Sequence, residues 1–161
     1  MFPTGKIKIS ILSGLLLALS GAGVAWSDFE KGFQAYERGD FNTAYKEWRP
    51  AADKGDPYAQ HMLGFLYANG RGVPLKPGET AQWIGRAADA GYPDAQYDYG
   101  VMHATGEGVD SNLSTAYMWL DLAADTKGLQ PGVFWKNIDK LLTPTQHLEA
   151  DWLKKPGNNS A

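Results

Sequence analysis

The side chains that most often carry out catalysis are few in this sequence, and none stands in a catalytic motif. Only three serines follow residue 27, and none lies in a G-x-S-x-G or S-x-x-K pattern. The absence of cysteine excludes thiolate nucleophiles, thiolate metal sites and disulfide bonds. Three scattered histidines lack the paired spacing of an H-E-x-x-H zinc site: His61, His103 and His147. We therefore predict no catalytic residues, no cofactor and no metal site.

Two further groups of residues have ligand-binding chemistry but a simpler structural explanation. Gly70-x-Gly72 and Gly106-x-Gly108 lack the third glycine or the lysine of a phosphate-binding loop, and glycine is favoured wherever a turn needs positive φ. Asp94, Asp98 and Glu107 carry the oxygen ligands that hard cations prefer, but no loop has EF-hand spacing. We interpret the glycines as turn residues and the carboxylates as solvated surface.

Composition and charge exclude further classes of function. The chain has 161 residues, of which 43% are hydrophobic and 20% charged, so it is too apolar for a disordered protein. Fifteen Lys and Arg against 18 Asp and Glu give a net charge of -3, whereas nucleic-acid binding needs a basic surface. We predict one folded unit that binds no nucleic acid.

Residues 1–27 have the order of a secretory signal peptide. Two lysines precede an apolar run from Ile9 to Leu19, and small residues follow it. This run has 11 residues, whereas a helix that spans a bilayer needs ~20. We expect cleavage between Ser27 and Asp28, with cleavage after Ala25 as the alternative. The mature protein is then periplasmic or secreted and does not insert into a membrane; an uncleaved N-terminal anchor is the other interpretation.

A repeat with a period of 36 residues runs through the middle of the chain. Short motifs of alanine, glutamine and glycine recur at this spacing: Ala59-Gln60 and Ala95-Gln96; Gly70-x-Gly72-Val73 and Gly106-x-Gly108-Val109; Ala51-Ala52, Ala87-Ala88 and Ala123-Ala124. So many matches at one offset indicate a repeat architecture, in which each unit is one supersecondary element.

Each unit is predicted to form two helices. Asp56 and Pro57 supply an N-cap and a first-turn proline, and apolar residues follow at helical spacing. Glycines and Pro74 then interrupt the pattern, and a second amphipathic stretch runs from about Gly78 to Ala90. Because one helix hairpin cannot bury both of its faces, the hairpins must stack. We predict an all-α solenoid of about eight helices with a C-terminal capping helix.

The repeat resembles the SEL-one-like repeat (SLR), a relative of the tetratricopeptide repeat, over about residues 29 to 128. The residues that match the pattern of this family lie in both helices and in the loop: Leu63, Gly64, Tyr67, Gly70, Gly72, Val73, Trp83, Ala87, Ala88 and Gly91. Three positions depart from it, since Thr80 replaces an alanine, Tyr99 a leucine and His103 a tyrosine. Most tryptophans occupy repeat positions, and we predict that they are buried: Trp48, Trp83 and Trp119.

The repeat boundaries divide the chain into segments. Residues 1–27 are the predicted signal peptide, 28–155 the solenoid and 156–161 a mobile tail. The solenoid itself is predicted to have four parts: an N-terminal helix pair at 28–54, repeats at 55–90 and 91–127, and terminal cap helices at 128–155. Within these parts we expect helices at 29–38, 42–53 and 131–142, and Thr143 and Gln146 form a capping box that opens a helix to about residue 155.

The resemblance implies a non-enzymatic module that holds a protein or peptide partner on its concave surface. We expect an exported adaptor or regulator. Two alternatives stay open at this point: a hydrolase acting on cell-wall or small-molecule substrates, and a structural subunit of an envelope complex.

The register of tetratricopeptide repeats implies which side chains face the partner. It is counted from Leu63, from Tyr99 and, in the N-terminal helix, from Gly39-Asp40. The implied residues lie on the first helices of successive hairpins: Phe33, Tyr58, His61, Phe65, Asp94, Tyr97 and Val101. Phe33, Phe65 and Tyr97 are expected to form an aromatic strip, with His61 and Asp94 as polar contacts. The alternative is that Phe29 and Phe33 pack against the second helix.

Overall fold

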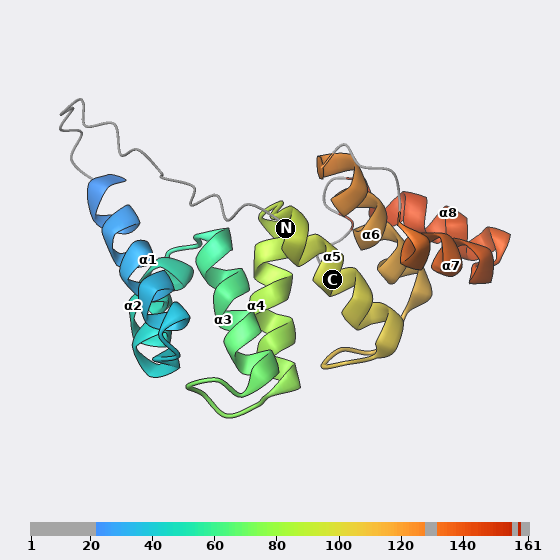
Figure 1. Ribbon diagram of the computed structural model, residues 1–161. Coiled ribbons are helices and arrows are strands. Elements are labelled where there is room, and N and C mark those ends of the chain that lie inside the picture. The colour runs from blue at the N-terminus through green and yellow to red at the C-terminus, as the bar shows by residue number, and fades with distance from the viewer. Residues whose placement is uncertain (1–21, 128–131, 156–157, 159–161) are drawn as a thin grey trace, which may run out of the picture.

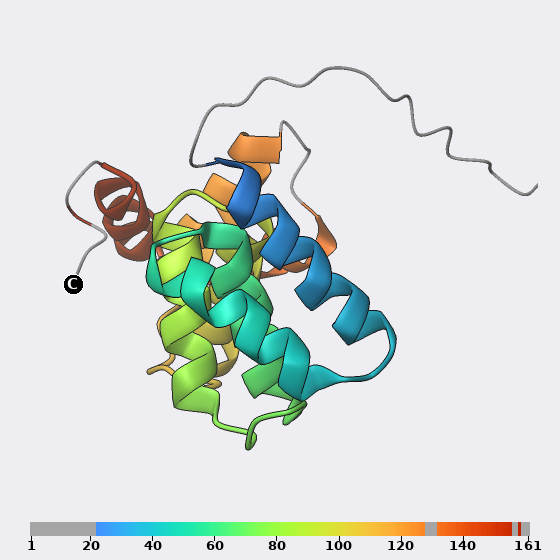
Figure 2. The same ribbon diagram turned by 90° about the vertical axis from the view of Figure 1, so that its left-hand side faces the viewer.

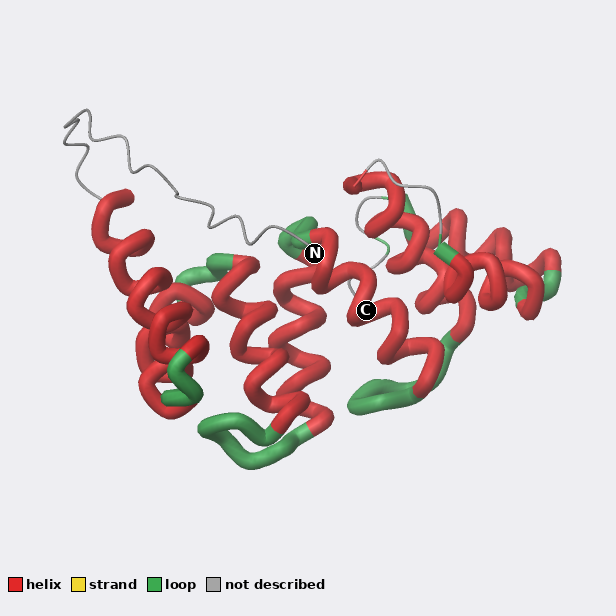
Figure 3. The backbone as a smooth tube through the Cα atoms, viewed as in Figure 1, coloured by secondary structure: helices red, strands yellow, loops and turns green. Residues whose placement is uncertain are grey.

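Eight helices follow one another along the residues described by this computed structural model, which are 22–127, 132–155 and 158. They are α1 (Ala22–Glu37), α2 (Phe41–Asp53), α3 (Pro57–Asn69), α4 (Pro77–Asp89), α5 (Pro93–Thr105), α6 (Leu113–Lys127), α7 (Val133–Leu141) and α8 (Pro144–Leu153). These residues contain no strand (Figure 3). The predicted all-α solenoid is confirmed, whereas the predicted tail at 156–161 lies, except for Asn158, outside the described residues.

The hairpins stand side by side in chain order (Figure 1). From α1 to α6 each helix packs against the next one along the chain, and α6 is then contacted by both α7 and α8. Figure 2, seen from the N-terminal side, shows α1 and α2 in front of the later hairpins. Each hairpin therefore covers the open face of the one before it, as a solenoid requires.

The 36-residue period reappears in the contacts between hairpins. Gly72 approaches the backbone of Phe41 at the start of α2, and Gly108 approaches that of Pro77 at the start of α4. A Cβ atom at these glycines would lie 2.5 Å from the Phe41 carbonyl carbon and 2.2 Å from the Pro77 oxygen. Both glycines have positive φ, 70° and 75°, which confirms that they are turn residues. Each loop is thus seated on the preceding hairpin.

The glutamine of the repeated Ala-Gln motif forms a hydrogen bond with the C-terminal end of the preceding helix. The Gln60 amide Nε2 donates to the Ala52 carbonyl oxygen at 3.0 Å, and the Gln96 Nε2 donates to that of Ala88 at 3.4 Å. Both glutamines are buried. Each carbonyl also accepts from the backbone N–H of Gly55 or Gly91, so the glutamine side chain adds a second donor at the helix end.

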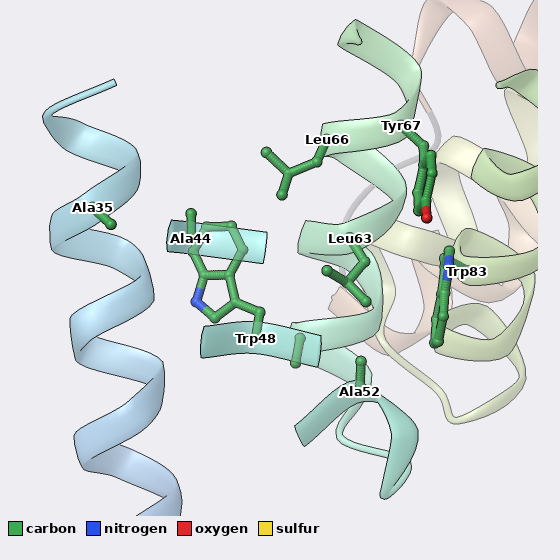
Figure 4. Packing of buried hydrophobic residues seen from close by; sticks show 9 residues of the cluster. Ala35, Ala44, Trp48, Ala52, Leu63, Leu66, Tyr67 and Trp83 are labelled. Atoms are coloured by element: carbon green, nitrogen blue, oxygen red, sulfur yellow. The ribbon is translucent and has the colours of Figure 1, made fainter. Parts of the chain in front are cut away.

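Trp48 is the centre of the first core. Its ring lies between Ala35 of α1 and Leu63 of α3 (Figure 4). The indole Nε1 donates to the Phe29 carbonyl oxygen at 3.2 Å. A Cβ atom added at Gly32 would lie only 2.3 Å from the same indole nitrogen. The absence of a side chain at residue 32 therefore lets α1 lie against the indole. Trp83 and Trp119 are buried too, which confirms the prediction for all three tryptophans.

The two departures from the family pattern in the second repeat pack against each other. The ring of Tyr99 lies 4.7 Å from that of His103 and 5.5 Å from that of Trp119, measured between centroids. Burial lowers the pKa of His103, whose Nδ1 lies 3.3 Å from the Asp110 carbonyl oxygen. His103 thus has the structural role that its place in the repeat indicates.

The two ends of the solenoid differ from its middle. Helix α1 begins at Ala22 rather than near Phe29, so its backbone runs through Ser27 and Asp28, where cleavage is expected. At the other end the predicted capping box is confirmed. Thr143 Oγ1 accepts from the Gln146 backbone N–H at 3.3 Å, and Gln146 Oε1 accepts from the Thr143 N–H at 2.9 Å.

His147 connects α8 to α7 through both of its ring nitrogens. Nε2 lies 3.0 Å from Asp139 Oδ1, and Nδ1 lies 3.1 Å from the Thr143 carbonyl oxygen. A neutral imidazole carries only one N–H, so the imidazolium alone can donate to both oxygens. The hydrogen bond to Asp139 accordingly raises the pKa of His147.

We expect this contact to stabilise the folded chain more in mildly acidic solution than in alkaline solution. A folded-state pKa above the usual 6.5 means that the contribution is fully present below about pH 6.5 and is lost as the pH rises through the folded-state pKa. The melting temperature of the wild type should therefore exceed that of a His147→Gln variant most at low pH. An NMR titration that places the pKa of His147 at or below 6.5 would contradict this expectation.

Candidate functional site

A groove opens between α3 and α5, and side chains of α4 form part of its lining. It has a volume of about 180 Å³. Its lining comes from all three helices and from the loop after α5: Gly64, Phe65, Ala68, Thr80, Ile84, Asp98, Val101, Met102 and Glu107. Gly64 brings α3 close to α4, because a Cβ atom there would lie 2.6 Å from Ile84 Cδ1. The width of the groove is therefore set by two helices, α3 and α5, that both pack on α4.

Phe65 forms the exposed part of the α3 wall. Its side chain remains 37% exposed although its ring lies 6.1 Å from that of Tyr36. The Arg71 guanidinium lies 5.8 Å from the Phe65 ring centre and 5.2 Å from that of Phe41, and its Nη1 donates to the Tyr36 hydroxyl at 2.8 Å. The contacts with Tyr36 and Arg71 fix the Phe65 ring on the side that faces α1, and the rest of the ring is exposed in the groove.

His61 and Asp98 join the two helices that border the groove. His61 Nε2 lies 2.9 Å from Asp98 Oδ2, so a hydrogen bond connects α3 to α5. The His61 side chain is 15% exposed and that of Asp98 is 48% exposed. The bond therefore orients a carboxylate that solvent, or a partner, can still reach.

A second group of aromatic rings lies near the starts of α3 and α5. The ring of Tyr58 is 4.6 Å from that of Phe29 and 5.6 Å from that of Tyr92, which in turn is 5.2 Å from His61. Burial, with Asp94 nearby, raises the pKa of Tyr92 to about 12. Tyr92 therefore stays a neutral hydrogen-bond donor over the physiological range.

The structure brings only part of the predicted partner-binding set together. Phe65 and Val101 line the groove, and His61 reaches it through Asp98. Three other predicted residues are exposed but outside its lining: Tyr58, Asp94 and Tyr97.

Phe33 differs most from the expected aromatic strip. It is half-buried against the core formed by α1, α2 and α3, as in the alternative interpretation. The aromatic residue of α1 that contacts Phe65 is Tyr36, almost one helical turn further along. The register set by Gly39-Asp40 does not identify the α1 residue that contacts Phe65, because Gly32 and Trp48 determine how this helix packs.

Of the nine lining residues, the predicted partner-binding set contains only Phe65 and Val101. The charged residues outside that set are Asp98 and Glu107. The sequence pattern places both carboxylates on a solvated surface, whereas the structure places them in the groove lining. One period after His61 and Asp98 stand Tyr97 and Phe134, so the His61–Asp98 hydrogen bond is not part of the repeat. The signal that points to Asp98 and Glu107 is their charge, on α5 and on the loop that follows it.

The described residues can also be compared with the requirements of a metal site and of a membrane-spanning helix. They contain no group of three or more His, Asp or Glu side chains placed to hold a metal ion. None of the helices in the described ranges has the length and the apolar character needed to cross a bilayer.

Stacked two-helix units with glycine-containing loops define an α-solenoid repeat protein. The Sel1 repeat model matches residues 57–92 and 93–125. A Sel1 repeat protein from Oxalobacter formigenes is 30% identical, with a TM-score of 0.61, over 64% of this chain and 82% of that one. This chain belongs to the Sel1 repeat family, whose repeats generally mediate protein–protein interactions and form a typically non-enzymatic scaffold.

A second solved structure is longer than this chain. It is a protective antigen present in uropathogenic Escherichia coli strains, which displays an SLR fold, and it is 27% identical with a TM-score of 0.72. The match covers 82% of this chain but only 29% of that one. Among curated proteins, none matches this chain.

Proposed function

We propose that this protein is an exported, non-enzymatic adaptor or regulator that binds a protein or peptide partner in the groove between α3 and α5. The observation that carries the proposal is the accessible Phe65 ring in an apolar groove bordered by two successive repeats. Export is supported by the signal-like order of residues 1–27. The partner class is supported by the interactions typical of Sel1 repeats.

Aromatic side chains make good anchors for a partner because they bury a large area with few rotatable bonds. Three of them are exposed on the two helices beside the groove, and Phe65 and Tyr97 are 37% and 47% exposed. Tyr58 completes the set on α3. A partner lying along α3 and α5 would cover all three.

Replacing Phe65 and Tyr97 with alanine should weaken partner binding without unfolding the protein. Truncating an aromatic anchor commonly costs ~2 kcal/mol or more, so we expect at least a tenfold loss of affinity. The measurement is capture of the partner from native envelope fractions by wild-type and variant protein, with the helical circular dichroism signal and melting temperature recorded alongside.

A Trp152→Ala variant is the matched control, because Trp152 is an aromatic residue on α8 that is 52% exposed and outside the groove lining. It should capture the partner as the wild type does. Unchanged capture by the Phe65→Ala/Tyr97→Ala variant would show that the partner uses another face, and unfolding of that variant would show that these side chains belong to the core.

A further inference from the structure

The groove carries charge of one sign among apolar walls. Asp98 and Glu107 are acidic, and none of the nine lining residues is basic. The remaining surface near them is apolar, with Phe65 on one side and Val101 and Met102 on the other. A cleft lined by one sign of charge attracts ligands of the opposite sign, so this groove favours a cation with an apolar body.

The size of the groove limits how much of a partner can enter it. Its volume of about 180 Å³ is close to that of cavities of roughly 150 Å³ that hold one benzene molecule. It therefore fits one side chain, while the peptide backbone stays outside. Lysine and arginine have the required form, because they bury an aliphatic stem along apolar surface and keep a charged head near polar groups.

We propose that the groove binds a lysine or arginine side chain of the peptide partner. Its aliphatic stem packs against Phe65, Val101 and Met102, and its cationic head lies beside Asp98 and Glu107. This inference rests on the proposed function, since it specifies the chemistry of the partner residue that enters the same groove.

The surrounding charges fix the direction of the bound side chain. Arg71 already lies over the Phe65 ring on the side of α1, so a second cation is repelled from there and directed toward α5. His61 holds Oδ2 of Asp98, and the half-exposed carboxylate retains Oδ1 for an incoming donor. The same acidic pair repels a peptide's C-terminal carboxylate, which excludes recognition of a free C-terminus at this point.

Blocked tripeptides with a central arginine, lysine or norleucine between two alanines test this inference. Norleucine has the stem of lysine without the ammonium group and isolates the contribution of charge. In NMR titrations of the labelled protein, followed at the amides of the groove lining, the arginine and lysine peptides should bind about five- to tenfold more tightly than the norleucine peptide. The Asp98→Asn/Glu107→Gln variant should remove this difference and bind the norleucine peptide as the wild type does.

An Asp151→Asn variant is the matched control, since Asp151 is an exposed acidic residue of α8 outside the groove lining. It should preserve the preference for arginine and lysine. Norleucine binding as tight as that of lysine, or a preference that survives in the Asp98→Asn/Glu107→Gln variant, would overturn the inference. If Phe65→Ala/Tyr97→Ala still weakens partner capture in that case, the proposed function stands and only the cationic residue is wrong.

Discussion

Replacing Trp48 with alanine is expected to lower the free energy of unfolding by about 3–5 kcal/mol. The side chain is 0% exposed and lies between α1 and α3, so its removal leaves a cavity at the junction of the first two hairpins. The indole hydrogen bond to the Phe29 carbonyl oxygen is lost as well. Domains of this size have a free energy of unfolding of only about 5–15 kcal/mol. The substitution therefore removes a large fraction of the stability of the fold.

The loss should be concentrated at the N-terminal end of the solenoid. Repeat stability is a sum of unit and nearest-neighbour contributions, so the α1–α2 pair should open before the later hairpins do. Urea denaturation measures the change in the free energy of unfolding. Hydrogen exchange of the backbone amides shows which helices lose protection. Trp152→Ala makes the same substitution at an exposed position and serves as the control. Its free energy of unfolding should stay within about 0.5 kcal/mol of that of the wild type. A similarly small change for Trp48→Ala would contradict the described core.

Replacing Gly108 with alanine is expected to cost about 2–5 kcal/mol, for two separable reasons. An alanine at a φ of +75° costs roughly 1–2 kcal/mol. The new Cβ would also lie 2.2 Å from the Pro77 carbonyl oxygen, so the loop must move off the start of α4, which adds roughly 1–3 kcal/mol. Chemical denaturation measures the sum.

Two other glycines separate these contributions. Gly91 has a φ of +83° with no atom within 4 Å of an added Cβ, so Gly91→Ala should show only the cost of the backbone conformation. Gly78 lies in the first turn of α4, without positive φ and without a nearby atom, so Gly78→Ala should be neutral or stabilising by up to about 1 kcal/mol. Equal losses at Gly108 and Gly91 would show that the loop does not press on α4 as described.

The fold was predictable from the sequence because its determinants are local or repeat at a fixed spacing. The loop glycines recur 36 residues apart, and the capping box at Thr143 acts within one helix terminus. Trp48 stands one place off the period, but its type and its place on an amphipathic helix still indicate burial. Hydrophobic periodicity and capping chemistry are the strongest signals that a single sequence carries.

The candidate site was less predictable because it lies between hairpins. Which side chains meet across the groove depends on the angle between successive units, and residue spacing does not encode this angle. The His61–Asp98 hydrogen bond falls outside the period, and Tyr36 rather than Phe33 contacts Phe65 because α1 is packed on Trp48. Phe65 and Val101 were found because they belong to the regular repeats.

The seating of each loop on the preceding hairpin also bears on how such chains change in length. The Gly72–Phe41 and Gly108–Pro77 contacts are the same contact displaced by one period, as are the Gln60–Ala52 and Gln96–Ala88 hydrogen bonds. Duplication or loss of a segment of one period therefore joins surfaces that already fit, whereas a change of any other length separates a glycine from the helix start it must meet. Evolution can thus lengthen or shorten the array in whole units without redesigning a junction, and the extent of the binding surface changes by the same step.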